Sequence, residues 1–137
     1  MEFNDLPKKL QQKFLDIFKE HLDAVKKILD QDGCLEPMLH ISSQSESQLI
    51  SLQPQDGIID EDKLLEKAIE IVKCQSFDTA LLSYSSSSIL KKSQALVTYI
   101  FDKSGTAVLY FTAYSYKGLF KKKVVLEKHI LGGTFNI

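Results

Sequence analysis

Cys34, Glu36 and His40 are the side chains whose types and spacing could do chemistry together. They alternate with other residues between positions 34 and 41, which predicts that they share one face of a β-strand. A carboxylate and an imidazole can exchange protons or hold a polar ligand, and a thiolate beside them can bind a metal ion. At about 3.3 Å per residue, however, His40 lies about 13 Å from Glu36 and about 20 Å from Cys34. We therefore predict a ligand-binding role for Glu36 and His40, and no metal site, cofactor or catalytic group.

Three other clusters have a simple structural interpretation. The run Ser85–Ser88 lacks a G-x-S-x-G elbow, so it indicates a loop, although its hydroxyls could bind a polar ligand or accept phosphate. Asp60–Asp62 begins a helical pattern and lacks the EF-hand spacing. Lys121–Lys123 opens the last strand, where lysine commonly guards an edge against aggregation; an acidic partner is the alternative.

Composition narrows the functional class. The chain has 137 residues and a net charge of −1, with charges of both signs interspersed, so we expect no attraction to nucleic acid or membranes. Its seventeen basic residues are all lysine, which disfavours bidentate phosphate or guanine recognition. Cys34 and Cys74 match no ligand spacing and are interpreted as free thiols in a reducing compartment. No signal peptide or membrane span is evident, so we expect a cytoplasmic location.

A long first helix is the clearest structural element. Asn4 or Asp5 can cap it and Gly33 can end it. At about 1.5 Å per residue it would measure close to 40 Å, so one end is expected to overhang the sheet. Its apolar face either packs on the sheet or contacts a partner. The apolar residues at helical spacing are Leu6, Leu10, Phe14, Ile17, Phe18, Leu22, Val25, Ile28 and Leu29.

A second helix and six strands complete the pattern. Asp60 can cap the second helix, which ends near Gln75. Pro37 cannot donate to a ladder, so its strand is expected at an edge or bulge. Gly132-Gly133 is expected to bend the chain into a tail that packs back on the domain. The predicted strands are Cys34–Ile41, Ser47–Gln53, Phe77–Tyr84, Ala95–Phe101, Thr106–Tyr114 and Leu119–Leu131.

Asp102–Gly105 predicts a hairpin turn between two of these strands. A loop of two or four residues would place Leu96, Thr98 and Ile100 on the core face together with Ala107, Leu109, Phe111 and Ala113. The opposite face would then be half exposed. It would carry four tyrosines, Tyr99, Tyr110, Tyr114 and Tyr116, which we predict to bind a partner.

The fold predicted is one α+β domain over residues 1–137, a mainly antiparallel sheet of about six strands with two helices on one face, in the order α-β-β-α-β-β-β-β. We favour a non-enzymatic protein-interaction domain that binds another protein or itself. One alternative is a small-molecule binder or modest enzyme with a pocket between the first helix and the sheet, with Glu36, His40 and the serine loop at its mouth. Another is an immunity or antitoxin-like protein.

Overall fold

In the described residues, two α-helices and six strands follow the predicted order. The structure is a computed structural model that describes residues 2–32, 34–54, 59–86, 94–118 and 123–137, without the side chain of Lys128. Several residues named in the predictions lie outside these ranges, namely Gly33, Ser87, Ser88, Leu119, Lys121 and Lys122. The elements are α1 (Lys8–Asp32), β1 (Met38–Ser42), β2 (Ser47–Ser51), α2 (Glu61–Lys73), β3 (Thr79–Ser86), β4 (Gln94–Asp102), β5 (Thr106–Lys117) and β6 (Lys123–Asn136).

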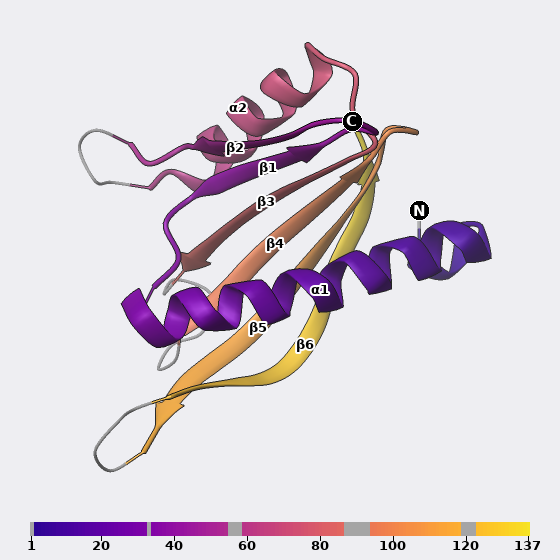
Figure 1. The fold of residues 1–137 in the computed structure, drawn as a ribbon. Helices are drawn as coiled ribbons and strands as arrows, with labels where there is room; N and C mark the ends of the chain where they lie inside the picture. Colours follow the sequence, from indigo (N-terminus) through magenta and orange to yellow (C-terminus); the bar gives the residue numbers. More distant parts are fainter. Residues whose placement is uncertain (1, 33, 55–58, 87–93, 119–122) are drawn as a thin grey trace.

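All six strands form one sheet in the order β2-β1-β3-β4-β5-β6, and each neighbouring pair is antiparallel (Figure 1). The α+β prediction is confirmed. The expectation that Pro37 marks an edge strand or a bulge is wrong, because β1 pairs with both β2 and β3 without a register shift. Pro37 precedes β1, where its missing N–H costs no ladder bond, and its carbonyl accepts from the Leu52 N–H at 3.0 Å.

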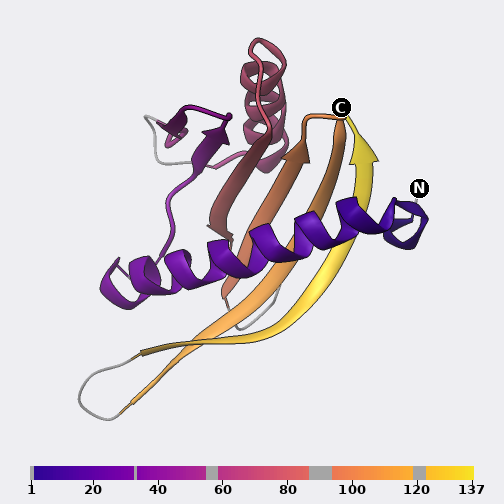
Figure 2. The same cartoon turned by 45° about the vertical axis from the view of Figure 1, so that its right-hand side comes forward.

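The first helix buries one apolar stripe against the sheet. The buried side chains of α1 are Phe14, Phe18, Leu22, Val25 and Leu29, spaced three or four residues apart. Two bonds hold its C-terminal end: the Tyr116 hydroxyl donates to the Leu29 carbonyl at 3.0 Å, and the Val124 N–H donates to Asp30 Oδ1 at 2.7 Å. The helix runs diagonally across the strands and its N-terminal end passes beyond β6 (Figures 1 and 2). The expected overhang is confirmed.

The second helix packs on the opposite face, so the prediction that both helices cover one face is wrong. Asp60 caps α2 as predicted, accepting from the Lys63 N–H at 3.2 Å. A helix is needed on each face because successive residues of the central strands point to opposite faces of the sheet and both are apolar. Leu81 packs in the core under α1 and Leu82 in the core under α2, and both are buried.

The β4–β5 hairpin also differs from the predicted register. Its turn contains three residues, Lys103–Gly105, and Gly105 takes φ +90° while its N–H donates to the Asp102 carbonyl at 2.9 Å. Compared with a loop of two or four residues, a loop of three residues turns every side chain of β5 to the opposite face of the sheet. Thr98 therefore faces Tyr110, and Leu109 and Phe111 lie on the side opposite α1.

The tail prediction is correct only in part: Phe135 and Ile137 pack against the core under α2, as expected. The chain does not bend away at Gly132-Gly133; β6 continues to Asn136, and its pairing with β5 shifts register beside these glycines. A Cβ at Gly132 would lie 2.6 Å from Phe111 Cε2. Glycine at this position therefore leaves room for the Phe111 ring beside β6. Half-buried aromatic side chains close this part of the face, with Tyr99 edge-on to Phe135 at 6.1 Å.

Candidate functional site

The edge of the sheet formed by β1 and β2 carries polar and exposed groups that could bind a ligand or a partner. His40 on β1 lies between Leu49 of β2 and Leu81 of β3, on the face that α1 covers. Its Nε2 lies 2.5 Å from Ser47 Oγ. One pocket flanks this edge under α1, a second flanks it beside α2, and the open side of β2 runs between them.

The first pocket has a volume of about 360 Å³ and lies between α1 and the sheet. Its polar wall is formed by His21 and Glu20 from the helix and His40, Ser42 and Thr79 from the strands. Its apolar wall is formed by Ile17, Ala24 and Leu81. The predicted pocket between the first helix and the sheet is thus present, and His40 lines it.

His21 is the central polar group of this pocket. Its Nε2 lies 2.5 Å from Ser83 Oγ, which lies 3.3 Å from the buried Thr98 hydroxyl. Burial, with a smaller contribution from the charge of His40, lowers the pKa of His21 to about 4. The imidazole is therefore neutral at pH 7 and can exchange hydrogen bonds with a ligand. Ser83 is only 1% exposed, so the pair is poorly placed to attack a substrate.

Glu36 and His40 are not brought together as one site. Glu36 is exposed in the segment before β1 and does not line the pocket that contains His40. The pocket also contains His21, which was not among the site residues predicted from the sequence. A signal was available, because His21 lies four residues after Ile17 and four before Val25, at the border of the buried stripe of α1.

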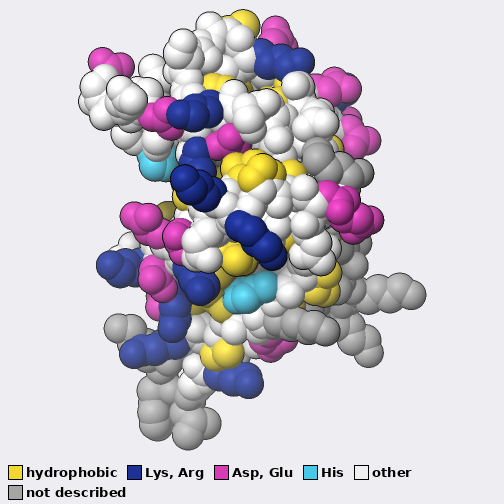
Figure 3. Space-filling view, turned by 90° about the vertical axis from the view of Figure 1, so that its right-hand side faces the viewer, with side chains coloured by type: hydrophobic (Ala, Val, Ile, Leu, Met, Phe, Trp, Pro, Cys, Tyr) yellow, Lys and Arg dark blue, Asp and Glu magenta, His cyan; other side chains and the backbone are white. Residues whose placement is uncertain are grey.

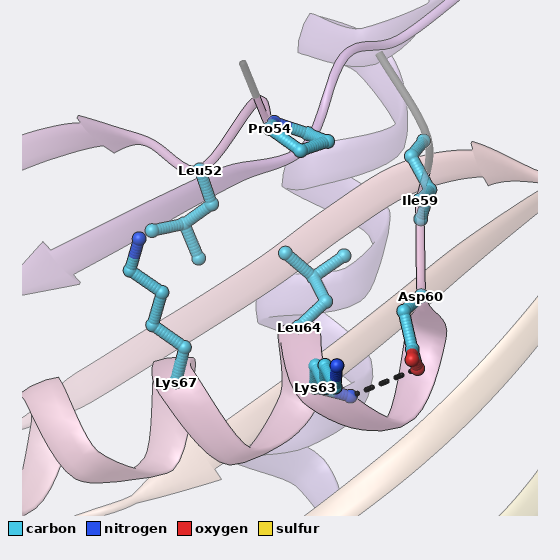
Figure 4. A pocket seen from close by; sticks show the side chains of 7 residues that line it. All are labelled: Leu52, Pro54, Ile59, Asp60, Lys63, Leu64 and Lys67. Carbon is cyan, nitrogen blue, oxygen red and sulfur yellow. Dashed lines mark hydrogen bonds between the residues drawn. The ribbon is translucent and has the colours of Figure 1, made fainter. Parts of the chain in front are cut away.

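The second pocket lies between α2 and the end of β2. It has a volume of about 380 Å³, and its lining is Leu52, Pro54, Ile59, Asp60, Lys63, Leu64 and Lys67. Figure 4 shows Lys67 extending from α2 toward Leu52. Lys63 and Lys67 are both exposed, so this pocket presents ammonium groups next to an apolar floor. Asp60 adds one carboxylate, which is held at the helix cap.

The backbone of β2 has a defined inner and outer side. The Leu52 N–H donates to the Pro37 carbonyl, and the Glu46 carbonyl accepts from the Ser43 N–H. These bonds flank the β1–β2 ladder and show that even-numbered residues of β2 direct their N–H and carbonyl groups toward β1. The odd-numbered residues Ser47, Leu49 and Ser51 therefore direct these groups outward, and all three residues are exposed.

The four tyrosines predicted to form an outward face do not share one. Tyr110 is 6% exposed and stacks on Phe18, with ring centroids 4.1 Å apart, and Tyr114 is 1% exposed and donates to Ser85 Oγ at 2.8 Å. Tyr116 contacts the end of α1, and Tyr99 lies on the opposite face. The expectation of a half-exposed tyrosine face is wrong, because the hairpin register turns Tyr110 and Tyr114 under α1.

The surface offers no large region of one charge in the view of Figure 3, where lysine and acidic side chains are interspersed and hydrophobic side chains lie between them. Within the described ranges, no group of three or more His, Cys, Asp and Glu side chains is arranged to hold a metal ion. Neither helix, as far as the structure describes them, combines the length and apolar character required to cross a membrane.

Comparison of the chain with models of known protein families, with curated proteins and with solved structures finds no match.

Proposed function

We propose that this chain is a non-enzymatic protein-interaction domain that binds an extended segment of its partner by adding it as a strand to β2. In this mode the backbone bonds of the edge strand supply affinity, and neighbouring side chains supply selectivity. We place this activity in the cytoplasm, in keeping with two exposed cysteines, Cys34 and Cys74, that are free thiols.

The contrast between the two edges of the sheet carries the proposal. β2 has the sequence SQLIS, without a charged residue, a proline or a bulge, and Leu49 is 66% exposed. β6, the other edge, carries Lys123 and Glu127 and has two register shifts against β5. Proteins usually protect sheet edges with charges, prolines or bulges, because an open edge templates further pairing. The absence of such protection on β2 favours its use as a binding edge.

The proposal is tested by removing one outward backbone donor. In Leu49→Pro the lost N–H does not belong to the β1–β2 ladder, so the domain is expected to fold, as circular dichroism would verify. Leu49→Thr is the matched control, since it shortens the same side chain and keeps the N–H. Each variant is used to capture partners from an extract of the native cell.

We expect Leu49→Pro to weaken partner capture about tenfold or more, since both the donor and the close approach of a strand are lost. Leu49→Thr should retain capture within a few-fold of the wild type. Wild-type levels of capture by a folded Leu49→Pro variant would refute binding through this edge.

A second candidate function is small-molecule binding in the pocket under α1. The observation that favours it is the convergence of His21 and His40 from different elements on one partly apolar pocket. A thermal-shift screen with small polar and amphipathic compounds tests it. A stabilising compound should lose its effect in His21→Phe and keep it in Glu36→Gln, whose side chain lies outside the pocket. The immunity-protein hypothesis stays a prediction, with no observation that favours it.

A further inference from the structure

We infer that the strand that pairs with β2 is β2 of a second copy of this chain. This inference rests on the proposed strand addition and names its partner. The two strands would run antiparallel about a two-fold axis at Leu49, joining two six-stranded sheets into one continuous sheet.

The backbone of β2 is complementary to itself in this arrangement. The outward-facing residues are Ser47, Leu49 and Ser51, which are placed symmetrically about Leu49. In the two-fold pairing Leu49 faces Leu49 of the second copy, and Ser47 faces Ser51. Each facing pair can exchange two N–H···O bonds, the strong pairing of an antiparallel ladder.

The side chains agree with the same register. Leu49 projects on the α1 side, beside His40, and the pairing would bury its exposed side chain against Leu49 of the second copy. Two leucines facing each other across an antiparallel pair contribute to its stability. The flanking Ser47 and Ser51 are small and uncharged, so they oppose no like charges across the pair.

Charge complementarity on the α2 side gives a second line of support. The register that pairs Leu49 with itself brings Glu46 of one copy opposite Leu52 of the other. Leu52 forms the floor of the pocket rimmed by Lys63 and Lys67, and Lys67 extends toward it (Figure 4). Glu46 is exposed and precedes the strand, so its carboxylate would enter the side of the interface where these ammonium groups lie.

The size of the contact sets the expected affinity. A pairing through one short strand and its neighbours falls below the area typical of permanent dimers. We therefore expect a reversible dimer whose population rises with concentration, observed by analytical ultracentrifugation. Amide hydrogen exchange should slow at Ser47, Leu49 and Ser51 as the dimer forms.

Reciprocal charges at Leu49 test the two-fold axis. Leu49→Lys and Leu49→Glu would each place like charges in contact at the axis, so each variant should be monomeric, with the dimer dissociation constant raised about tenfold or more. An equimolar mixture of the two should recover a dimer that contains one copy of each. Leu15→Lys is the matched control, because Leu15 is an exposed leucine on α1, 37% exposed, away from β2, and its change should leave the dimer intact.

Glu46 and Lys67 test the register. Glu46→Lys and Lys67→Glu should each weaken the dimer, and the double variant should recover it. A wild-type chain that is monomeric at all concentrations, or a dimer that Leu49→Lys leaves unchanged, would overturn the inference. A monomeric wild type whose capture of cellular partners is still lost in Leu49→Pro would overturn self-pairing alone and leave the proposed function standing. If Leu49→Pro changes neither dimerisation nor capture, both fail.

Discussion

Acidification is expected to destabilise this protein through His21 in particular. The imidazole is packed between α1 and the sheet, beside Ser83, with His40 and Glu20 lining the same pocket. Its pKa falls from 6.5 in the unfolded chain to about 4 in the folded one. Below pH 6.5 the unfolded state therefore binds a proton that the folded state does not, and folding stability decreases as the pH falls toward 4.

The size of the stability loss follows from the difference between the pKa of His21 in the unfolded chain and in the folded one. Each pH unit between the two pKa values costs about 1.4 kcal/mol of folding free energy, so about 2 kcal/mol is lost at pH 5 relative to pH 7. Complete protonation below pH 4 would cost about 3 kcal/mol. A loss of this size is a large share of the free energy that holds a small domain folded.

The assay compares urea unfolding of the wild type and His21→Gln at pH 7 and pH 5. Glutamine is uncharged at both pH values and can still hydrogen bond Ser83, while the titrating carboxylates are common to both proteins. The wild type should lose about 2 kcal/mol more than the variant over this interval. Replacing His40 with glutamine should reduce the extra loss, because it removes the second cause of the lowered pKa of His21.

An equal loss in the wild type and His21→Gln would refute this reasoning. So would an NMR titration in which the His21 ring protonates near pH 6.5 while the protein stays folded, since burial would then impose no cost on the charged form.

Three further predictions concern the packing and pairing of individual side chains. Tyr110→Phe should raise the free energy of unfolding by about 1 kcal/mol in urea titrations, because the buried hydroxyl has no hydrogen-bond partner among the described residues; a loss of stability would mean that the hydroxyl is bonded. Gly132→Ala should cost about 1–3 kcal/mol by thermal unfolding, since its methyl group would overlap the Phe111 ring; an unchanged melting temperature would contradict the close packing. Asp102→Asn should cost about 1–3 kcal/mol at pH 7 by removing the charge that pairs with Lys13. Burial raises the pKa of Asp102, but bonds from Lys13 and Ser104 outweigh it and hold the pKa below 3.8, so the stability difference should shrink as the pH falls below that value.

Local patterns in the sequence predicted the elements well. The apolar spacing from Phe14 to Leu29 indicated α1, and the carboxylate of Asp60 indicated where α2 begins. Both depend on interactions within a few residues of the chain, namely a helical stripe and a capped N–H. The antiparallel sheet followed from several β-rich runs separated by turns too short to hold a helix.

Local patterns could not predict which face of the sheet each side chain occupies or which face each helix covers. One additional residue in the turn before Thr106 reverses every side chain of β5, and this moved Tyr110 from the expected surface into the core. The side covered by each helix depends on pairing between distant strands. The adjacent leucines Leu81 and Leu82, both buried, were the local indication that a helix packs on each face of the sheet.

The candidate site was predicted only in part. His40 was identified as a potential ligand residue, whereas its neighbour His21 comes from a helix that is distant in sequence. Likewise, the lack of charge in β2 could be read from the sequence, but its position at the edge could not. Proline at position 37 suggested the wrong strand, because a proline just before a strand costs no ladder bond.

The packing of the first helix on the last strands has a consequence for synthesis on the ribosome. The apolar face of α1 packs partly on β3 and β4, and its cover is complete only when residues 106–136 have been made, which is after most of the chain has emerged. Until then the nascent helix presents Phe14, Phe18 and Leu22 to its surroundings. Such late closure slows folding and leaves the apolar side chains of the growing chain open to premature association.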